Sequence, residues 1–485
     1  MVAIRQAAPT AAPQQTVRRL LPLLFTLAVG GVWLAGSGRP FSFPLDDAYI
    51  TLHNARALWA GGDANYGVSP LVGATSLAHL ALIALLLPFA GPVGADITAC
   101  LAGALLYLWG VERLASRHGL SLAATGALML VAAGSASLFL QLCNGLETSL
   151  VLAGVTWAIV LADGDKPSRA LPLLCGLLPF LHPELGLLSA TLMLRQAWRR
   201  WQGGEVRAIA MDFALAFAAA FPWMLWSWLQ TGAVVPNTAA AKIAFFADAQ
   251  RPLAWKLQTA GEALLAGIGL PLLALPFARR SSLALALLVF ALVFLGVSLW
   301  LYASGLDTYR GRYVVSLLPA CLWALSAWSG PLRVRAVLLW ACAVVAIPGV
   351  VQAKLLLEAL ARFTADEAVA VDWAERNLPH DRTVLVHDAG MSAYASTLKL
   401  CDVVGLKTPS AMAVHQALTG RDEAQRGAAI VRIAASCRPG FAIVHHVPFW
   451  SDMTANLKQA GWRLELLRPA GAAGGYDVWR LTPPG

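Results

Sequence analysis

Two adjacent carboxylates, Asp46 and Asp47, follow the first long apolar run of the chain and open the segment DDAYI. The run, residues 20–35, is apolar enough to enter a bilayer, so the pair is expected to emerge at the far interface. There the pair can supply one general base and one group that orients a substrate or binds a cation. The pattern therefore predicts chemistry at a membrane surface.

A structural role competes with this interpretation of the pair. Aspartate is a favoured helix N-cap, and residues 48–60 have the apolar spacing of a short amphipathic helix. Capping accounts for one of the two carboxylates but not for both. The sequence does not distinguish which of Asp46 and Asp47 acts as the base.

Two further groups of titratable residues lie at or within apolar runs. Glu147 follows Asn144 by three residues, which is capping-box spacing, so a capping role and a functional role both stay open. His182 and Glu184 flank Pro183 in the middle of a long apolar run, where a titratable pair is functional by default.

Three cations, Lys242, Arg310 and Arg312, lie in polar breaks that the topology below assigns to the outer side, where basic residues are normally scarce. A lipid phosphate explains them, because the guanidinium fork of arginine matches phosphate oxygens. Ordinary binding to anionic lipid head groups is the alternative.

The chain has 485 residues, of which 58% are hydrophobic and 13% are charged, with a mean hydropathy of +0.63. Soluble domains carry about 25% charged residues, so we expect a polytopic α-helical membrane protein. About eleven spans are predicted, at residues 20–35, 71–90, 95–111, 119–140, 147–162, 170–194, 208–229, 261–277, 282–302, 313–329 and 336–352. The net charge of +9 comes mainly from small clusters at the ends of these runs, which indicates positive-inside topology and not nucleic-acid binding.

The charge rule predicts a cytoplasmic N-terminal tail (1–17), a membrane region (18–352) with a first outer loop (37–70), and an outer C-terminal part (353–485). The first helix is expected to remain uncleaved, and 170–194 to form a broken pair. Two full crossings between residues 70 and 111 would put Arg113 and Arg117 outside, so one of those runs is expected to be re-entrant or interfacial.

The C-terminal part is predicted to form a small α/β domain. We expect a helix over 366–376 and strands at 383–387, 398–404, 441–445, 462–467 and 476–481. Cys401 and Cys437 can form a disulfide if this part faces an oxidising compartment, whereas Cys100, Cys175, Cys321 and Cys342 lie in apolar runs as packing residues.

Asp388 ends the first of these strands, beside His387, at a position where α/β folds often bind ligands. The nearby glycines do not form a dinucleotide fingerprint. His445 and His446 end another strand but lack a third ligand, so no metal site is predicted. A divalent cation at the acidic pair of the first outer loop is left open, and no other cofactor is expected.

The DDAYI segment leads through a short helix to a Gly-rich stretch with Ser69-Pro70-Leu71 and Gly73-Ala74-Thr75-Ser76. This arrangement resembles the first outer loop of bacterial polytopic glycosyltransferases of the GT-C fold, such as the mycobacterial-type and pilin-modifying arabinofuranosyltransferases. In this chain the Ser-Pro-Leu element comes before the Thr-Ser element. Further similar motifs follow in order: NGLET (144–148), HPE (182–184), VPNT (235–238) with Lys242, HDAG (387–390) and DVVGL (402–406).

The resemblance implies transfer of a sugar, with arabinofuranose favoured, from a polyprenyl-phosphate donor to a cell-envelope glycan, lipopolysaccharide or pilin outside the membrane. It implies a multi-pass protein of the bacterial inner membrane with a cytoplasmic N-terminus and a periplasmic or extracellular C-terminal part. Asp46 or Asp47 is then the base, and Lys242, Arg310 and Arg312 bind the donor phosphate. The cavity is expected to be lined by Tyr49, His53, Glu147, His182, Glu184, Asn237 and Asp388; His182 replaces an arginine of the family motif.

Two other classes of protein fit part of this pattern. A lipid-sugar flippase or transporter also needs a cationic phosphate site between helices, but such proteins are commonly built from internal repeats, and the sequence shows none. A non-catalytic scaffold for envelope assembly has no need of buried carboxylates.

Overall fold

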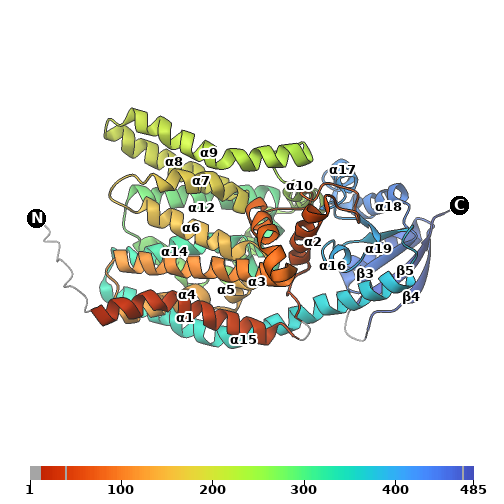
Figure 1. Ribbon diagram of the computed structural model, residues 1–485, viewed down its shortest axis with the longest axis horizontal. Helices are drawn as coiled ribbons and strands as arrows, with labels where there is room; N and C mark the ends of the chain where they lie inside the picture. Colours follow the sequence, from red (N-terminus) through yellow and green to blue (C-terminus); the bar gives the residue numbers. More distant parts are fainter. Residues whose placement is uncertain (1–11, 39–40, 472–474, 485) are drawn as a thin grey trace, which may run out of the picture.

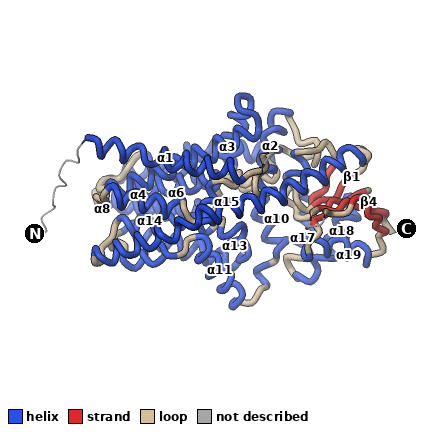
Figure 2. Tube along the Cα trace, turned by 90° about the horizontal axis from the view of Figure 1, so that it is seen from below, coloured by secondary structure: helices blue, strands red, loops and turns tan. Residues whose placement is uncertain are grey.

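Long helices run side by side along one axis of the molecule, and a small sheet with its own helices closes one end (Figures 1 and 2). This computed structural model describes residues 12–38, 41–471 and 475–484. Residues 1–11 of the expected cytoplasmic tail therefore lie outside the described residues. The first described helix, α1 (Ala12–Gly36), begins at the end of the molecule opposite to the sheet.

Among the described residues, five helices are long and apolar enough to cross a membrane: α1, α3 (Leu77–Arg117), α9 (Val206–Thr231), α12 (Ser282–Leu301) and α15 (Leu332–Asn377). Two bent pairs raise the number to seven: α4 (Leu122–Ala133) with α5 (Ala136–Leu142), and α11 (Leu253–Gly267) with η2 (Leu270–Phe277). The chain is thus a polytopic helical membrane protein, but the predicted count of about eleven spans is not confirmed. Several apolar runs form helices too short to be counted alone: α6 (Thr148–Ala162), α7 (Ala170–Leu181) and residues 314–326.

Helix α3 contains residues 77–90 of the first apolar run and all of the run 95–111, and it bends at Gly91. Gly91 has a φ of 67°, a left-handed conformation that glycine adopts without strain, and prolines at 88 and 92 flank it. Non-helical backbone at Gly91 therefore divides α3 into two helical segments, one for each run. The expectation that one of the two runs is re-entrant or interfacial stays a prediction. The 170–194 region is broken as predicted, because α7 ends before His182 and α8 (Leu185–Gln202) begins after Glu184.

The outward surface of the bundle is apolar, as a lipid-facing surface must be. Only 6% of the apolar window of α9 is buried inside the protein, and α9 lies at the edge of the bundle in Figure 1. The helix exposes a row of large apolar side chains: Phe213, Phe217, Phe221, Leu225 and Trp228.

All five predicted strands are confirmed, in one sheet of order β2-β1-β3-β5-β4. The strands are β1 (Thr383–Val386), β2 (Lys399–Asp402), β3 (Phe441–His445), β4 (Arg463–Arg468) and β5 (Tyr476–Thr482). β1 is parallel to β2 and β3, whereas β5 is antiparallel to β3 and β4. Helices α17 (Pro409–Ala417), α18 (Arg426–Cys437) and α19 (Pro448–Gln459) belong to the same part of the chain, and a Cys401–Cys437 disulfide confirms the expected pairing.

Short elements fill the junction between the bundle and the sheet. They are α2 (Asp46–Ala60), α10 (Asn237–Phe246), η1 (Asp248–Gln250), α13 (Ala303–Gly311), η3 (Val314–Leu317), α16 (Met391–Tyr394) and η4 (Glu423–Gln425), whereas α14 (Leu318–Ser326) lies within the bundle (Figures 1 and 2). The predicted helix 366–376 is the last part of α15, which runs without interruption for 46 residues from the bundle to the sheet (Figure 1). This junction holds the candidate site.

Candidate active site

Asp46 and Asp47 occupy the first turn of α2, but neither caps it. The N-cap is Leu45, and it makes no side-chain capping bond. The prediction that capping explains one of the carboxylates is therefore wrong, because both side chains turn to partners on distant segments.

Asp46 faces the C-terminal part of the chain. Its carboxylate accepts hydrogen bonds from the backbone N–H groups of Gly390 (3.0 Å) and Met391 (2.6 Å), at the start of α16. Burial and the nearby Asp388 carboxylate raise the pKa of Asp46 well above its usual range, although these hydrogen bonds work in the opposite direction. Asp46 therefore joins α2 to the loop after β1.

Asp47 faces the membrane domain, where two cations hold one of its oxygens. Asp47 Oδ2 lies 3.3 Å from Lys242 Nζ, which α10 supplies, and 3.4 Å from Arg312 Nη1, directly after α13. Burial alone would lower the pKa of Lys242, but the Asp47 carboxylate, followed by Tyr313 and Tyr302, raises it above the usual range. The Asp47 carboxylate thus favours the charged form of Lys242.

Behind Arg312 the charges continue in a chain. Arg312 Nη2 donates to Glu147, and His182 Nε2 lies 3.4 Å from the same Glu147 oxygen. His182 Nδ1 pairs with Glu184 across the break between α7 and α8. The capping-box alternative for Glu147 is wrong, because its side chain makes no cap bond and Asn144 bonds the Leu146 N–H instead.

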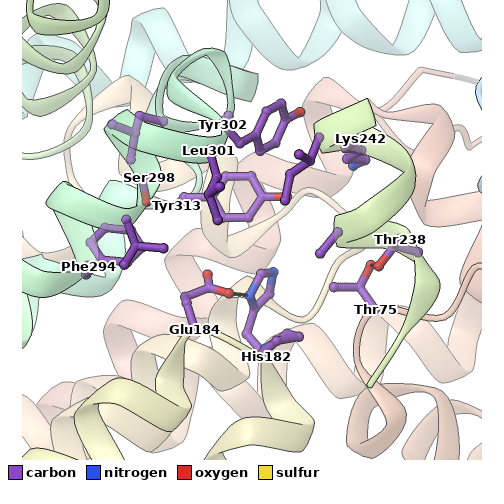
Figure 3. A pocket seen from close by; sticks show the side chains of 16 residues that line it. Thr75, His182, Glu184, Thr238, Lys242, Phe294, Ser298, Leu301, Tyr302 and Tyr313 are labelled. Atoms are coloured by element: carbon purple, nitrogen blue, oxygen red, sulfur yellow. Dashed lines mark hydrogen bonds and ion pairs between the residues drawn. The ribbon is translucent and has the colours of Figure 1, made fainter. Parts of the chain in front are cut away.

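Two adjoining cavities meet at these residues. The polar one has a volume of about 20 Å³ and is lined by Asp47, Thr51, Thr75, Glu147, Thr238, Lys242 and Arg312, with Ile50, Gly73, Leu146 and Leu406. The apolar one has a volume of about 140 Å³, and α12 forms one wall through Phe294, Val297, Ser298 and Leu301. Figure 3 shows Lys242 near the Thr75–Thr238 pair, with Tyr302 and Tyr313 beside it and His182 and Glu184 across the cavity. Thr75, Thr238 and Lys242 line both cavities.

Of the predicted cavity residues, Tyr49, His53 and Asn237 line neither of these two cavities. The Tyr49 hydroxyl bonds Ser42 Oγ and the Phe43 N–H, and His53 Nε2 lies 3.0 Å from Asp63 Oδ1. Asn237 accepts from the Gly73 N–H and donates to the Leu406 carbonyl oxygen, at 3.1 and 2.9 Å. All three connect loops around the site.

Asp388 and Arg310 also lie away from the two cavities. Asp388 pairs with His387 (3.1 Å) and accepts from the Tyr476 hydroxyl, on the far side of Asp46. The Arg310 side chain is exposed, and its backbone carbonyl accepts from Ser137. The left-handed backbone at Tyr309 and Arg310 brings Arg312, and not Arg310, to Asp47.

Sequence reasoning missed the cavity walls from α12 and the tyrosines at 302 and 313. It also missed a fully buried cluster in which His79 Nε2 lies 3.2 Å from Asp96 Oδ1, and Cys100 Sγ lies 3.6 Å from the same oxygen. These three side chains are close enough to share a metal ion, although they supply one ligand fewer than a structural zinc site usually has. Only the Asp96–Cys100 spacing is visible in the sequence, because the bend at Gly91 brings His79 to them.

Comparisons with known proteins agree with the architecture. Residues 358–479 match a family described as "Domain of unknown function (DUF8728)". No curated protein matches the chain. Two crystal structures of ArnT from Cupriavidus metallidurans, one in the apo state and one bound to undecaprenyl phosphate, each superpose with a TM-score of 0.57 at 14% identity, covering 97% of this chain and 98% of ArnT.

This chain has the GT-C fold of ArnT. The likeness extends over nearly the whole length of both chains, so it includes the sheet as well as the helical bundle. The fold expected from the sequence motifs is therefore confirmed.

Proposed function

We propose that this protein is a glycosyltransferase of the bacterial inner membrane that moves a sugar from a polyprenyl-phosphate donor to an acceptor on the outer face. One observation carries the proposal. A carboxylate, Asp47, and two cations, Lys242 and Arg312, meet where a polar cavity adjoins an apolar cavity walled by the membrane helix α12. Such a junction suits a molecule with a charged head and an apolar chain. ArnT, which shares the fold, has been crystallised with undecaprenyl phosphate.

The donor phosphate binds between Lys242 and Arg312, and its prenyl chain lies in the apolar cavity. Leu301 and Trp300, at the end of α12, are exposed on the bundle surface, so the chain can enter sideways from the bilayer. The described residues offer no hydrogen-bond partner to Arg312 Nε, although this atom is buried. A phosphate oxygen would satisfy it.

The transfer needs a base and a good leaving group. The acceptor hydroxyl oxygen attacks the anomeric carbon of the sugar, the bond from that carbon to the phosphate oxygen breaks, and polyprenyl phosphate leaves with the electron pair. Asp47 takes the proton of the hydroxyl. Lys242 and Arg312 stabilise the charge that develops on the leaving phosphate.

Asp47 suits the role of base better than Asp46. Asp46 is already engaged by the N–H groups of Gly390 and Met391, whereas Asp47 lines the polar cavity. Asp46 positions α2 against the C-terminal part, which we place with residues 353–485 on the outer face. Arabinofuranose is the sugar favoured by the motifs, and the acceptor is an envelope glycan, lipopolysaccharide or pilin.

The test uses full-length protein in lipid nanodiscs with synthetic polyprenyl-phosphate pentoses and hexoses and an envelope extract as acceptor. Release of free polyprenyl phosphate from one of these donors is expected. Asp47→Asn should slow release by about 10²–10⁴-fold, the usual contribution of a general base. Glu465→Gln, which neutralises an exposed carboxylate on β4, is the matched control and should be unchanged.

Full activity of the Asp47→Asn variant would contradict the role of Asp47. If the wild-type protein moves a fluorescent donor across the bilayer without cleaving it, the protein is a flippase and not a transferase. If it does neither, the enzymatic proposal fails.

A further inference from the structure

In the donor-free site, Asp47 occupies the position of an anion. Its Oδ2 atom contacts both Lys242 Nζ and Arg312 Nη1. The side chains of Lys242 and Arg312 are only 14% and 5% exposed. An incoming anion can therefore contact only those of their atoms that face the cavity. Asp47 Oδ2 already contacts both groups on this cavity-facing side.

Glu147 supplies the second negative charge that balances the two cations. It is 3% exposed and accepts from Arg312 Nη2, whereas Asp47 contacts Nη1 of the same guanidinium. The two cations are thus matched by two carboxylates, one deeply buried and one at the cavity wall. An anionic donor that entered without any rearrangement would add an unbalanced charge to a buried site, which is strongly unfavourable.

The volume of the polar cavity also indicates that Asp47 must move before a donor phosphate can bind both cations. The polar cavity has a volume of about 20 Å³, which is about enough for one water molecule. A phosphate group with its ester oxygens is several times larger than a water molecule. It can reach both cations only if the Asp47 side chain, which is 17% exposed and lies at the wall, turns away.

We propose that the Asp47 carboxylate is a built-in counter-ion, which the donor phosphate displaces from Lys242 and Arg312, so that the base becomes free only when a donor is bound. This inference rests on the proposed function. A phosphodiester carries one negative charge, so the exchange leaves the charge around the two cations unchanged.

The same exchange helps the product to leave. Transfer leaves a proton on Asp47 and a phosphate monoester on the two cations. Once Asp47 gives its proton to water, its carboxylate again competes for Lys242 and Arg312 and favours release of polyprenyl phosphate. A neutral side chain at position 47 cannot compete and should retain the product.

The test is a binding titration of full-length protein in nanodiscs with undecaprenyl phosphate. Asp47→Asn should bind it about tenfold more tightly than wild type, since no ion pairs have to be broken first. Asp47→Glu, which keeps the charge, should remain within about twofold of wild type. Glu184→Gln removes a carboxylate that lines the apolar cavity and pairs with His182 but contacts neither cation, so it measures the effect of a negative charge lost nearby without breaking a contact of Lys242 or Arg312.

The outcomes separate this inference from the proposed function. Tighter binding by Asp47→Asn but not by Glu184→Gln supports displacement. Equal or weaker binding by Asp47→Asn, or an equal gain in both variants, overturns displacement while leaving the donor site intact. Absence of binding in the wild type and in every variant overturns both, whereas binding seen only with Asp47→Asn supports both.

Discussion

At the scale of single residues, two neighbouring aspartates perform different tasks. Adjacent positions on a helix point about 100° apart, so Asp46 meets the C-terminal part and Asp47 meets the cations of the membrane domain. The sequence predicts the pair but not this division, because the partners are supplied by α10, the segment after α13 and the loop after β1. These segments are brought together only by the fold.

Arg312 is expected to be irreplaceable by lysine. Its guanidinium contacts Asp47 and Glu147 at once, and a single ammonium group cannot reproduce this geometry. Arg312→Lys should reduce kcat/KM for polyprenyl phosphate release by about 10- to 100-fold, or roughly 1.4 to 2.7 kcal/mol of transition-state stabilisation. The matched control is Arg310→Lys, which changes an exposed side chain two positions away. Equal losses in both variants would contradict the assignment.

His415 should make the stability of the protein depend on pH. Burial lowers the pKa of His415 from 6.5 to about 4 in the folded protein, against the hydrogen bond to the Val403 carbonyl. Between these values the unfolded chain binds a proton that the folded chain does not, so the stability from this group is complete above pH 6.5 and is lost as the pH falls towards 4.

Comparison with His415→Gln isolates this contribution. The free energy of unfolding of wild type minus that of the variant should increase by about 3 kcal/mol between pH 4 and pH 6.5. The measurement is denaturant unfolding in detergent followed by tryptophan fluorescence. A difference that does not change with pH would show that His415 keeps an ordinary pKa in the folded protein.

At the scale of elements, the packing of α15 depends on a close approach at Gly349. A Cβ atom there would lie 2.4 Å from the Gly134 carbonyl oxygen and 2.8 Å from Ser135 Cα, which are backbone atoms at the α4–α5 bend. Gly349→Ala should therefore destabilise the protein by about 1–3 kcal/mol, although alanine favours helices. Gly296→Ala is the control, because a Cβ atom there meets nothing within 4 Å. A thermal shift assay should show a lower midpoint for the first variant alone.

The same elements show what the sequence could predict. The break at His182 to Glu184 and all five strands were predictable, because Pro183 and the short apolar runs are local signals. The number of membrane spans was not predictable from apolar runs. Hydropathy measures composition and length, whereas the bends after Ala133 and Gly267 depend on packing against neighbouring helices. The cavity walls from α12 were also missed, since apolar residues that line a cavity resemble in sequence those that face lipid.

At the scale of the whole molecule, a buried lysine joins the C-terminal part to residues 54–72, in and after α2. Lys407 Nζ lies 2.7 Å from Asp63 Oδ2 and donates to Asn54 and to the Val72 carbonyl oxygen, and its side chain is fully buried. Burial alone would raise the pKa of Asp63, but the His53 hydrogen bond and the Lys407 charge hold it below its usual range.

Removing one partner of this pair should be costly. Lys407→Met leaves Asp63 charged and buried, and should destabilise the protein by about 3–5 kcal/mol. Asp63→Asn in the same chain should restore part of that loss, because the buried negative charge that has lost its lysine is gone. Unfolding midpoints of the two single variants and the double variant give the coupling energy. Strictly additive losses would show that the two residues do not depend on one another.

The contact between Asp46 and Gly390 can form only late in synthesis of the chain. Asp46 and its partner Gly390 are 344 residues apart in the chain, so at about 5–20 residues per second the ribosome needs roughly 20 to 70 s to make the second after the first. Throughout that interval the segment that carries Asp46 and Asp47 is already synthesised but has no C-terminal part to pack against. A protein truncated before residue 390 should therefore insert into the membrane and remain inactive, because Gly390, Met391 and Leu406 complete the candidate active site.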